Sequence, residues 1–279
     1  MTLTLAATPL GNPGDASPRL RAAIEEAEII AAEDSRRFHR LASDLGVTFT
    51  AKIISFFDGN ETARTQEVLS FLQAGKRVLV VSDAGMPTIS DPGFRLMRDA
   101  ISEKIDVKVI PGPSAPTMAI ALSGLPTDRF TFEGFAPRTA GARLAFYESL
   151  RFEERTMVLF EAPHRLLESL TDARTVLGGS RLCAICREMT KTYEETIRGT
   201  LDELIEWATS REILGEITLV FGGVEVGTKT ATQGDITARV KEFEAAGMDR
   251  KSAIATVAEE LDLPKKIVYA AVVEAKNSN

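Results

Sequence analysis

Short apolar runs recur through the first 221 residues, and most are followed by a polar loop and then by a longer amphipathic segment. Runs of this length, rich in Val, Ile and Leu, indicate buried strands. They predict strands over 3–8, 28–32, 53–57, 77–82, 107–110, 130–135, 156–160, 181–186 and 216–221. Helices are predicted over 17–27, 35–45, 61–73, 141–150 and 201–209, with others opening after 91–92, 114 and 161–165. This alternation predicts an α/β fold with mostly parallel strand pairing, mixed in the second half.

The stretch VLVVSDAGMPTISDPGF, residues 78–94, joins a predicted strand to a predicted helix through a polar loop. Asp91 is expected to cap the free amides of that helix, with Pro92 at its first position. A second strand, over 107–110, ends in the unusual loop PGPSA. Because parallel strands end at the same edge of a sheet, the two loops predict one small-molecule pocket at that edge.

The chain changes character after the last predicted strand. Residues 222–234 (GGVEVGTKTATQG) contain many Gly and Thr but few large apolar residues, which is typical of a linker. Three short helices are then predicted over 235–246, 251–261 and 264–275, and they resemble a helix-turn-helix module. We therefore predict two α/β lobes, 1–112 and 113–223, a linker over 224–234 and a helical module over 235–279. Composition alone does not make that module a nucleic-acid binder, because Asp and Glu balance its Lys and Arg.

The composition is that of an ordinary globular protein, with 44% apolar and 26% charged residues. No apolar run approaches the roughly eighteen residues of a membrane-spanning helix, and the N-terminus lacks a signal-peptide pattern. The two cysteines, Cys183 and Cys186, favour a reducing cytoplasm over a disulfide framework. A net charge of −7 gives no overall attraction to nucleic acid, so an RNA partner would need a local positive cleft.

Several common site motifs are missing from the sequence. There is no G-x-G-x-x-G after the first strand, no G-x-x-x-x-G-K-[ST] and no G-x-S-x-G, which argues against a dinucleotide site, a P-loop and a serine hydrolase. The two histidines, His39 and His164, lie in different halves, so a histidine-based metal site is not expected. Residues three apart on a strand face opposite sides, so Cys183 and Cys186 are interpreted as core residues and not as a redox or zinc pair.

Charged residues gather just after the predicted strands. They are Asp34, Arg36, Asp83, Asp91, Glu161, Arg165, Arg187, Glu188 and Lys191. Helix caps and solvated loops also favour such residues, but as a set at the edge of one or two sheets they favour a polar cleft. In the PGPSA loop, two prolines without amide protons would hold the Ser114 and Ala115 backbone in place, which suits binding of a flat heterocycle by its edge.

Eight motifs in order resemble the ribosomal RNA small-subunit methyltransferase I family, which belongs to the S-adenosylmethionine-dependent tetrapyrrole-methylase-like superfamily. They are ATPLGNPGD, AAEDSRR, SFFDGNE, VSDAGMPTISDPG, PGPSA, SGLPTDRFTFEGFAP, FEAPHR and REMTKTYEE. The match covers about residues 3–223, and GMDRKSAIATVAEELDLPKKIVY resembles the terminal module of the family. One such motif would be a weak signal, whereas eight in sequence are a strong one.

The resemblance implies a class III S-adenosylmethionine methyltransferase, a homodimer of two-lobed α/β subunits with the cofactor in the cleft between the lobes. It implies methylation of the ribose 2′-hydroxyl of a cytidine in the decoding region of 16S rRNA, with the small ribosomal subunit as partner. By motif position, cofactor contacts are expected at Leu10, Asp83, Gly85, Met86, Ser114, Ala115 and Phe160. The chain departs from the family at Met86, where threonine is common, at Phe57-Asp58-Gly59 and at Leu159-Phe160-Glu161. These departures leave the loop lengths intact but put in doubt a hydroxyl role at residue 86 and a histidine role near Gly59.

A ribose hydroxyl is a poor nucleophile, so the implied reaction calls for a general base worth about 10²–10⁴-fold in rate. The expected candidates are Asp34, Glu161, Glu188 and, if burial lowers its pKa, Lys191. Arg36, Arg165 and Arg187 are expected to hold phosphates of the RNA, because guanidinium groups pair bidentately with phosphate oxygens. Two other interpretations stay open: methylation of a tetrapyrrole or another small molecule on the same fold, and a ribosome-binding protein without catalysis.

Overall fold

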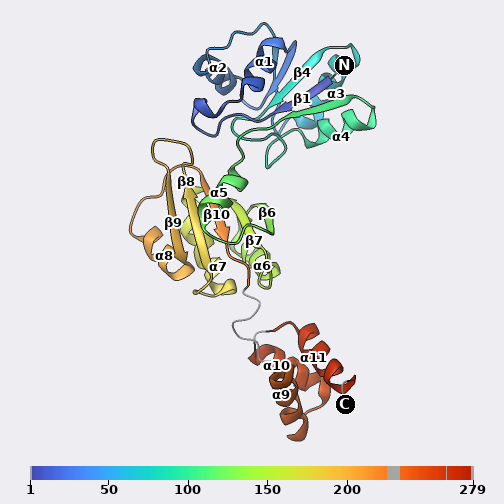
Figure 1. Cartoon of the computed structure of the whole chain (residues 1–279), viewed down its shortest axis with the longest axis vertical. Helices are drawn as coiled ribbons and strands as arrows, with labels where there is room; N and C mark the ends of the chain where they lie inside the picture. The colour runs from blue at the N-terminus through green and yellow to red at the C-terminus, as the bar shows by residue number, and fades with distance from the viewer. Residues whose placement is uncertain (1, 225–232, 262, 278–279) are drawn as a thin grey trace. The chain divides into compact units, whose positions relative to one another are not determined.

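The computed structural model describes residues 2–224, 233–261 and 263–277. The chain divides into two compact units, Met1–Val224 and Glu225–Asn279 (Figure 1). The first unit contains two five-stranded sheets, and the described part of the second is helical. Most of the predicted linker over 224–234 lies outside the described residues, and the predicted lobe boundary at residue 112 stays a prediction.

The first sheet holds five parallel strands in the order β3-β2-β4-β1-β5. They are β1 (Thr2–Ala6), β2 (Ile29–Ala32), β3 (Lys52–Ser55), β4 (Arg77–Val81) and β5 (Asp106–Ile110). Strand β1 lies between β4 and β5, with Leu3 opposite both Val78 and Val107. Because every strand runs the same way, the loops that follow β1, β2, β4 and β5 all begin at one edge of the sheet.

Helices cover both faces of this sheet, as its buried strands require. They are α1 (Pro18–Glu26), α2 (Ser35–Asp44), α3 (Glu61–Gln73) and α4 (Phe94–Ser102). On one face, Leu20 of α1 joins a core cluster with Leu79; on the other, Leu96 of α4 joins a cluster with Val78. Figure 1 shows β1 and β4 between the pair α1–α2 and the pair α3–α4. The neighbours Val78 and Leu79 thus point into different cores, because side chains alternate along a strand.

The second sheet is mixed, in the order β6-β7-β10-β8-β9, which confirms the mixed pairing expected of the second half. Its strands are β6 (Phe130–Phe135), β7 (Thr156–Glu161), β8 (Leu182–Arg187), β9 (Glu195–Thr200) and β10 (Ile217–Phe221). Strands β6 and β7 pair in parallel, and the other neighbours are antiparallel. The sequence pattern does not predict β9 (ETIRGT), because this edge strand is largely polar and none of its residues is fully buried.

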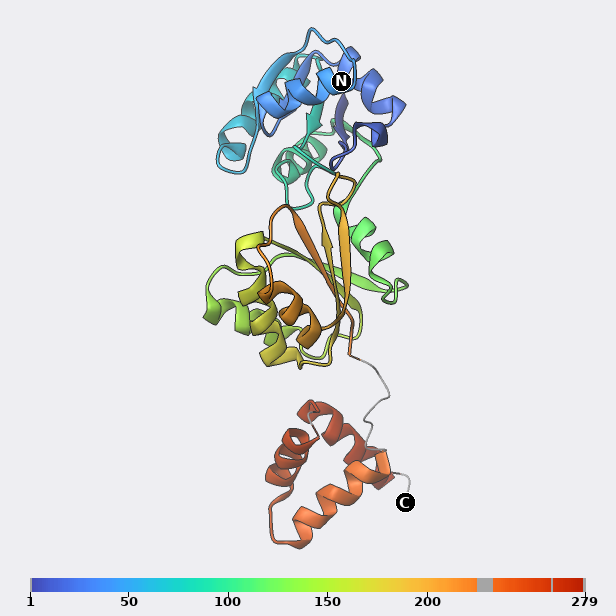
Figure 2. The same ribbon diagram turned by 90° about the vertical axis from the view of Figure 1, so that its left-hand side faces the viewer.

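Helices also cover the two faces of the second sheet, with α5 on one face and three helices on the other (Figure 2). They are α5 (Ala115–Ser123), α6 (Ala140–Ser149), α7 (Leu166–Leu177), which follows the short 3-10 turn Pro163–Arg165, and α8 (Leu201–Thr209). Cys183 packs in the core beneath α6–α8, whereas Cys186 packs in the core beneath α5, and both are buried. Their interpretation as core residues on opposite faces is therefore confirmed.

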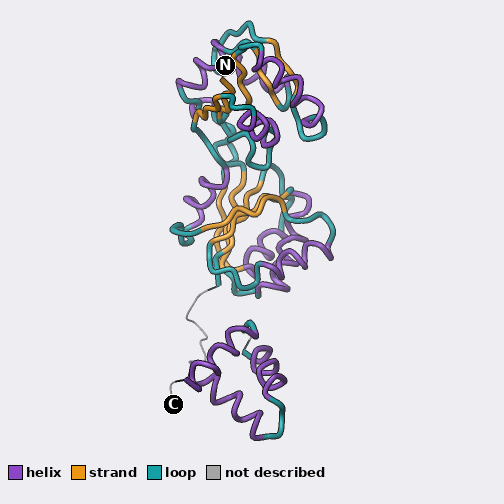
Figure 3. Tube along the Cα trace, turned by 90° about the vertical axis from the view of Figure 1, so that its right-hand side faces the viewer, coloured by secondary structure: helices purple, strands orange, loops and turns teal. Residues whose placement is uncertain are grey.

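The second unit consists of α9 (Gln233–Ala245), α10 (Arg250–Glu260) and α11 (Lys265–Asn277), seen as helix in Figure 3. Each helix contributes fully buried side chains, among them Val240, Val257 and Val268, to one shared core. This unit therefore has a hydrophobic core of its own, as an independently stable body requires.

The start of α4 differs from the prediction, because neither Asp91 nor Pro92 begins the helix. The helix begins at Phe94, and its N-cap is Gly93, with a φ of +123° and no capping side chain of its own. The buried carboxylate of Glu61, on α3, instead accepts hydrogen bonds from the amides of Gly93 (3.0 Å) and Arg95 (3.1 Å). A neighbouring helix thus satisfies the free amides that Asp91 was expected to cap.

Glu61→Ala is expected to lower the free energy of unfolding by about 2 kcal/mol, because the amides at the start of α4 lose a charged acceptor in a partly buried place. Glu67→Ala, on the same helix, is the matched control. Glu67 pairs with Lys52 and Arg64 near the surface, so its loss should cost less than about 1 kcal/mol. Urea unfolding of both variants measures the difference, and equal losses would contradict the capping role of Glu61.

Candidate active site

Three loops meet at the carboxyl edge of the first sheet. The amide of Thr8, after β1, donates to the carbonyl of Gly85, after β4 (2.8 Å), and the Gly85 amide donates back to Thr8 (3.1 Å). Gly85 has a φ of +84°, and a Cβ on it would lie 3.2 Å from Leu10 Cδ2 and 3.8 Å from the Pro113 carbonyl oxygen. A glycine at this position therefore allows the close approach of the loops that carry Leu10 and Ser114.

The loop after β4 has an uncommon backbone conformation. Thr88 (φ +78°) and Ser90 (φ +63°) both adopt left-handed angles, at a cost of about 1–2 kcal/mol each. Amide hydrogen bonds from Thr88 to Pro92 and from Ile89 to Met86 fold the loop back on itself. Strained residues other than glycine persist where the surroundings fix them, and they are common at ligand sites.

Asp83 links the ends of β2 and β4. Its carboxylate accepts a hydrogen bond from the Asp34 amide (3.0 Å) and pairs with Arg37 (3.3 Å), while its own amide donates to the Glu33 carboxylate (3.1 Å). Burial raises the pKa of both Asp83 and Glu33, and the opposing hydrogen bonds only partly offset this rise. The edge of the first sheet therefore carries a compact, partly buried acidic group.

Asp91 lies in the loop after β4, beside Ser82. Burial, and after it the negative charge of Glu33, raises the pKa of Asp91 to about 7, against the effect of its hydrogen bond with Ser82. Asp91 therefore titrates in the neutral range, where an ordinary aspartate is fully ionised.

Asp91→Asn is expected to change how the free energy of unfolding depends on pH. Because the folded-state pKa is raised, the stability that protonated Asp91 contributes is complete below about pH 4 and is lost as the pH rises through about 7. Asparagine stays neutral and can still accept a hydrogen bond from Ser82, so the variant should not lose this stability. We expect its advantage over the wild type to grow by about 1 kcal/mol between about pH 5 and pH 8, which is half of the roughly 2–3 kcal/mol that the raised pKa implies over this range, because the carboxyl is partly exposed.

Urea unfolding across this pH range measures the effect of Asp91. Asp128→Asn is the control, because Asp128 is an exposed aspartate in the turn before β6 and should follow the wild type at every pH. An Asp91→Asn curve parallel to that of the wild type would show that the carboxyl is already ionised throughout this range.

Asp34 is the N-cap of α2. Its carboxylate accepts hydrogen bonds from the Arg36 side chain (2.9 Å) and from the amides of Arg36 (2.8 Å) and Arg37 (3.4 Å). These bonds, above all that of the Arg36 guanidinium, lower the pKa of Asp34 to about 2. Such a weakly basic carboxylate is poorly matched to proton transfer near neutral pH. The side chain of Arg36 is 90% exposed and accessible to a partner.

A second charged cluster lies at the end of β8. Lys191 Nζ donates to Glu188 (2.8 Å) and Glu216 (3.0 Å), and the Glu188 carboxylate also accepts from the Glu216 amide (2.9 Å). Burial raises the pKa of Glu188, but the bonds from Lys191 and the Glu216 amide outweigh it and lower the pKa overall. Burial lowers the pKa of Lys191, but its two carboxylate partners raise it overall. Lys191 is therefore a cation here, and the lowered pKa that a lysine base would need is absent.

The Glu188–Lys191 cluster reaches the edge of the first sheet. A Cβ on Gly11, in the loop after β1, would overlap Cγ of Lys191, so the lysine stem lies directly on this glycine. The charge of Glu216 also contributes to the raised pKa of Asp83. Residues from the second half of the first unit thus add to the edge formed by the first half.

Phe160 of β7 lies in an aromatic cluster. Its ring centroid is 4.9 Å from that of Phe132 and 5.4 Å from that of Phe135, both on β6. Strand β6 is irregular between these two residues, and a Cβ on Gly134 (φ +70°) would lie 3.8 Å from Ser90 Oγ. This irregularity therefore brings β6 next to the loop after β4.

Glu161 and Arg165 form a buried ion pair. Glu161 is 2% exposed, and one carboxylate oxygen accepts from Arg165 (2.6 Å) and from the Ala162 amide (2.8 Å). Its other oxygen is buried without a hydrogen-bond partner among the described residues. Arg187 is likewise engaged, with Glu195 at 3.2 Å. All three arginines thus have a carboxylate partner, but Arg165 and Arg187 are largely buried with theirs, whereas the side chain of Arg36, which pairs with Asp34, is 90% exposed.

The structure brings the predicted Leu10, Asp83 and Gly85 together at one edge. Glu33, Arg37 and Glu216 also belong to this charged edge, although they are not among the site residues predicted from the sequence. Glu33 and Arg37 lie inside the motif AAEDSRR, beside the predicted residues Asp34 and Arg36. Their position just after a predicted strand is the sequence feature that points to this edge. Glu216 joins Glu188 because β10 pairs with β8, and no local sequence pattern reveals that pairing.

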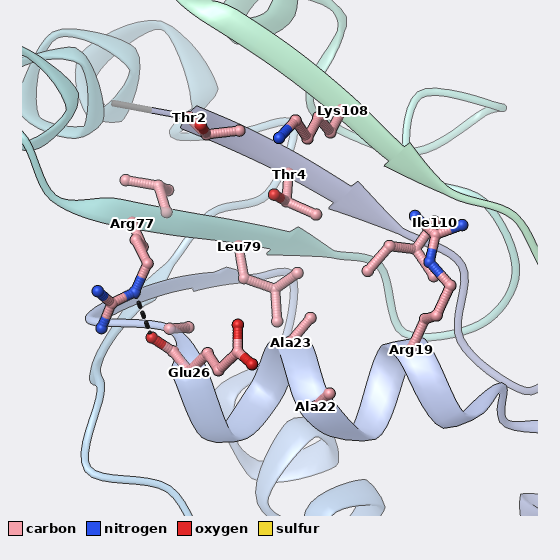
Figure 4. Close-up of a pocket in the computed structure, with 12 residues that line it drawn as sticks. Thr2, Thr4, Arg19, Ala22, Ala23, Glu26, Arg77, Leu79, Lys108 and Ile110 are labelled. Carbon is pink, nitrogen blue, oxygen red and sulfur yellow. Dashed lines mark hydrogen bonds between the residues drawn. The ribbon is translucent and has the colours of Figure 1, made fainter.

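A cavity of about 360 Å³ lies away from this edge, between α1 and strands β1, β4 and β5 (Figure 4). It is lined by Thr2, Thr4, Arg19, Ala22, Ala23, Glu26, Ala27, Arg77, Val78, Leu79, Lys108 and Ile110. At its rim the Arg77 guanidinium donates to the Glu26 carbonyl (2.7 Å), the bond dashed in Figure 4. None of the predicted site residues lines the cavity, so the converging loops, and not this hollow, define the candidate site.

Within residues 2–224, 233–261 and 263–277, no helix combines the length and apolar character needed to cross a membrane. Over the same residues, no group of three or more His, Cys, Asp or Glu side chains is arranged to hold a metal ion.

Comparison with known proteins defines the class of fold. The family described as Tetrapyrrole (Corrin/Porphyrin) Methylases matches residues 2–205. The structure of uroporphyrin-III C-methyl transferase from Thermus thermophilus, complexed with S-adenyl homocysteine, is similar with a TM-score of 0.54 and 16% identity, over 79% of this chain and 96% of that one. The fold is therefore the two-lobed α/β fold of the tetrapyrrole methylases, as predicted.

Sequence relatives define the family within this class. Ribosomal RNA small subunit methyltransferase I from Mycobacterium tuberculosis is 49% identical over 256 residues, which cover 92% of this chain and 88% of that protein. The protein of the same name from Thermotoga maritima is 42% identical over 223 residues, which cover 80% of this chain and 99% of that protein. The chain belongs to the ribosomal RNA small subunit methyltransferase I family, which confirms the resemblance carried by its motifs.

Proposed function

We propose that this protein transfers a methyl group from S-adenosylmethionine to the ribose 2′-hydroxyl of a cytidine in the decoding region of 16S rRNA. The observation that carries the proposal is membership of the ribosomal RNA small subunit methyltransferase I family, with a relative 49% identical over 92% of the chain. The proposed substrate is the small ribosomal subunit in the cytoplasm, and the proposed working form is a homodimer, as the family resemblance implies.

The carboxyl edge of the first sheet fits the cofactor. Gly85, whose amide and carbonyl both pair with Thr8, lets the loops that carry Leu10 and Ser114 approach closely enough to line one site. Helix α5 begins at Ala115, and its N-cap residue, Ser114, makes no side-chain cap, so its first amides suit a polar or anionic group. The residues proposed to hold the cofactor are Leu10, Asp83, Gly85, Met86, Ser114, Ala115 and Phe160. When bound, S-adenosylmethionine supplies a methyl group that its sulfonium already activates.

Glu188 and Lys191 are proposed as the catalytic pair. Of the other candidate bases, Asp34 is engaged in capping α2 and in bonding Arg36, while Glu161 is buried against Arg165. Lys191 contacts Gly11 in the loop after β1, which puts the pair beside the proposed cofactor site. Glu188 would accept the proton of the ribose hydroxyl, and Lys191 would stabilise the negative charge that develops on the ribose oxygen.

Arg36 is the best supported of the three arginines proposed to hold RNA phosphates, because it is exposed at the edge of the site. Arg36 pairs with Asp34 at the surface, whereas Arg165 and Arg187 lie largely buried beside Glu161 and Glu195 and would have to leave them to reach a phosphate. A protein of net charge −7 that binds a folded subunit through a local basic surface should show a shallow dependence of affinity on salt.

One assay separates the proposed function from its alternatives. Labelled S-adenosylmethionine is supplied with purified small ribosomal subunits, with protein-free 16S rRNA and with a tetrapyrrole precursor. Label on the 2′-oxygen of a cytidine in the subunits is the expected result. Label in the tetrapyrrole alone would overturn the proposal, and cofactor binding without transfer to any of the three would favour a non-catalytic ribosome-binding protein.

A further inference from the structure

The second unit is not needed to form the fold of the methyltransferase. It has its own core, to which α9, α10 and α11 all contribute. The Thermotoga maritima relative aligns over 223 residues that make up 99% of its length, so it is shorter than this chain by about the length of Glu225–Asn279. A unit that one relative lacks must serve a role other than completing the first unit.

Helices α10 and α11 form a helix-turn-helix arrangement with a short connection. The Leu263 amide donates to the Ala258 carbonyl (2.8 Å), and the Ile267 amide donates to the Pro264 carbonyl (2.8 Å), which ends one helix and starts the next. In this arrangement the second helix presents the residues of its first turns outward to a partner. Here that helix is α11, whose inner face is buried through Val268 among others.

The outward face of α11, made of Lys266, Tyr269, Ala270 and Val273, combines a cation with an exposed aromatic ring. These residues follow the i, i+3, i+4, i+7 spacing that makes one helical stripe, and all of them are exposed. Tyr269 is 60% exposed, and Ile267, beside the stripe, is 44% exposed. Tyr269, Ile267 and Val273 thus leave several apolar side chains exposed close together on one helix. A group of exposed apolar side chains next to a lysine is typical of a contact surface.

The charges of the second unit leave the start of α11 positive. Most described acidic side chains of the unit already have partners: Glu242 and Glu260 pair with Arg239, and Glu244 pairs with Arg250. Lys265 and Lys266 have no ion-pair partner among the described residues of the unit. The balanced composition of the unit thus hides a local cationic surface, which matches a polyanion better than an acidic protein surface.

We propose that the outward face of α11 is a contact surface for the rRNA substrate, a role that rests on the proposed function of the first unit. Lys266, with Lys265 beside it, would pair with backbone phosphates, and Tyr269 would stack on an unpaired base. A single-stranded or looped segment is the proposed target, because the deep, narrow major groove of an RNA duplex does not admit side chains, whereas an unstacked base offers its face to an aromatic ring.

The experiment measures equilibrium binding of the full chain to purified small ribosomal subunits and to protein-free 16S rRNA over a series of salt concentrations. Lys266→Ala/Tyr269→Ala is expected to weaken binding to both by about 10-fold or more, and Lys266→Ala alone should reduce the slope of log affinity against log salt by about 0.7–0.9. Both residues are exposed, so the fold should be unchanged by circular dichroism. Lys241→Ala removes an exposed lysine from α9 and is the matched control, expected to bind like the wild type apart from a weak general charge effect.

The outcomes separate this surface from the proposed function. Wild-type affinity of Lys266→Ala/Tyr269→Ala for both probes would overturn the proposal, and so would a loss confined to intact subunits, which would indicate a ribosomal protein as the partner. Methyl transfer at saturating subunit should proceed in the variant at the wild-type maximal rate with a raised KM. If the wild type binds rRNA through α11 but transfers no methyl group, the proposed function fails and the RNA-contact surface stands.

Discussion

Lys191→Met should lower the maximal rate of methyl transfer to small ribosomal subunits by about 100-fold, while the affinity for S-adenosylmethionine stays close to that of the wild type. Methionine keeps an unbranched stem to pack on Gly11 but removes the charge that bonds Glu188 and Glu216. The two carboxylates then lack their shared cation, so the pKa of Glu188 should rise. The acidic limb of the pH–rate profile should move to higher pH accordingly.

Single-turnover rates over a pH series test this expectation for Lys191. Glu188→Gln should lose a similar factor in rate and should also lose the acidic limb, since it removes the titrating group itself. Lys52→Met is the matched control, because Lys52 also pairs with a glutamate, Glu67, but at the start of β3, away from the loops of the site. Full transfer rates in both Glu188→Gln and Lys191→Met would remove the segment REMTK from the proposed catalytic machinery.

Gly85→Ala should weaken cofactor binding by at least about 10-fold. The new methyl group would lie 3.2 Å from Leu10 Cδ2, and alanine is disfavoured at a φ of +84°. The loops that carry Thr8 and Gly85 are joined by two backbone hydrogen bonds, so neither can shift alone to relieve the contact. The free energy of unfolding should fall by about 1 kcal/mol as well.

Gly75→Ala separates the local contact at Gly85 from the general cost of a left-handed alanine. Gly75 has a nearly identical φ of +82°, but a Cβ there meets nothing within 4 Å. Both variants should therefore lose stability by urea unfolding, Gly85→Ala the more of the two because of its contact with Leu10, and only Gly85→Ala should lose affinity for S-adenosylhomocysteine by calorimetry. Equal affinity in the two variants would exclude Gly85 from the cofactor site.

Much of the fold followed from local patterns, because each buried strand carries its own apolar run. The runs over 77–82 and 216–221 correspond to β4 and β10, and the alternation of strand and helix indicated the α/β class. Strand β9 was not predicted, because it lies at the edge of its sheet, where a strand can pair with one neighbour without carrying a continuous apolar run. The start of α4 was not predicted either, because the carboxylate that accepts hydrogen bonds from its first amides belongs to Glu61, on a different helix.

The candidate site was predictable as a set of loops and much less so as a set of contacts. Motif order placed Leu10, Asp83 and Gly85 in loops after parallel strands, and parallel pairing brings such loops together. Which charges neutralise one another depends on tertiary packing. The inward pairing of Arg165 with Glu161 and the double pairing of Lys191 are therefore visible only in three dimensions.

The packing of Lys191 on Gly11 has a consequence for protein synthesis. The two residues are about 180 positions apart, so the contact closes one of the longest loops in the first unit and needs both sheets in place. While the chain is still being synthesised, it contains the first sheet and its loops before it contains β8 and Glu216. Until those residues are made, the cluster around Lys191 cannot form. An incomplete copy emerging from a ribosome is therefore expected to be inert towards the ribosomal RNA around it, and methyl-transfer competence arises only late in synthesis.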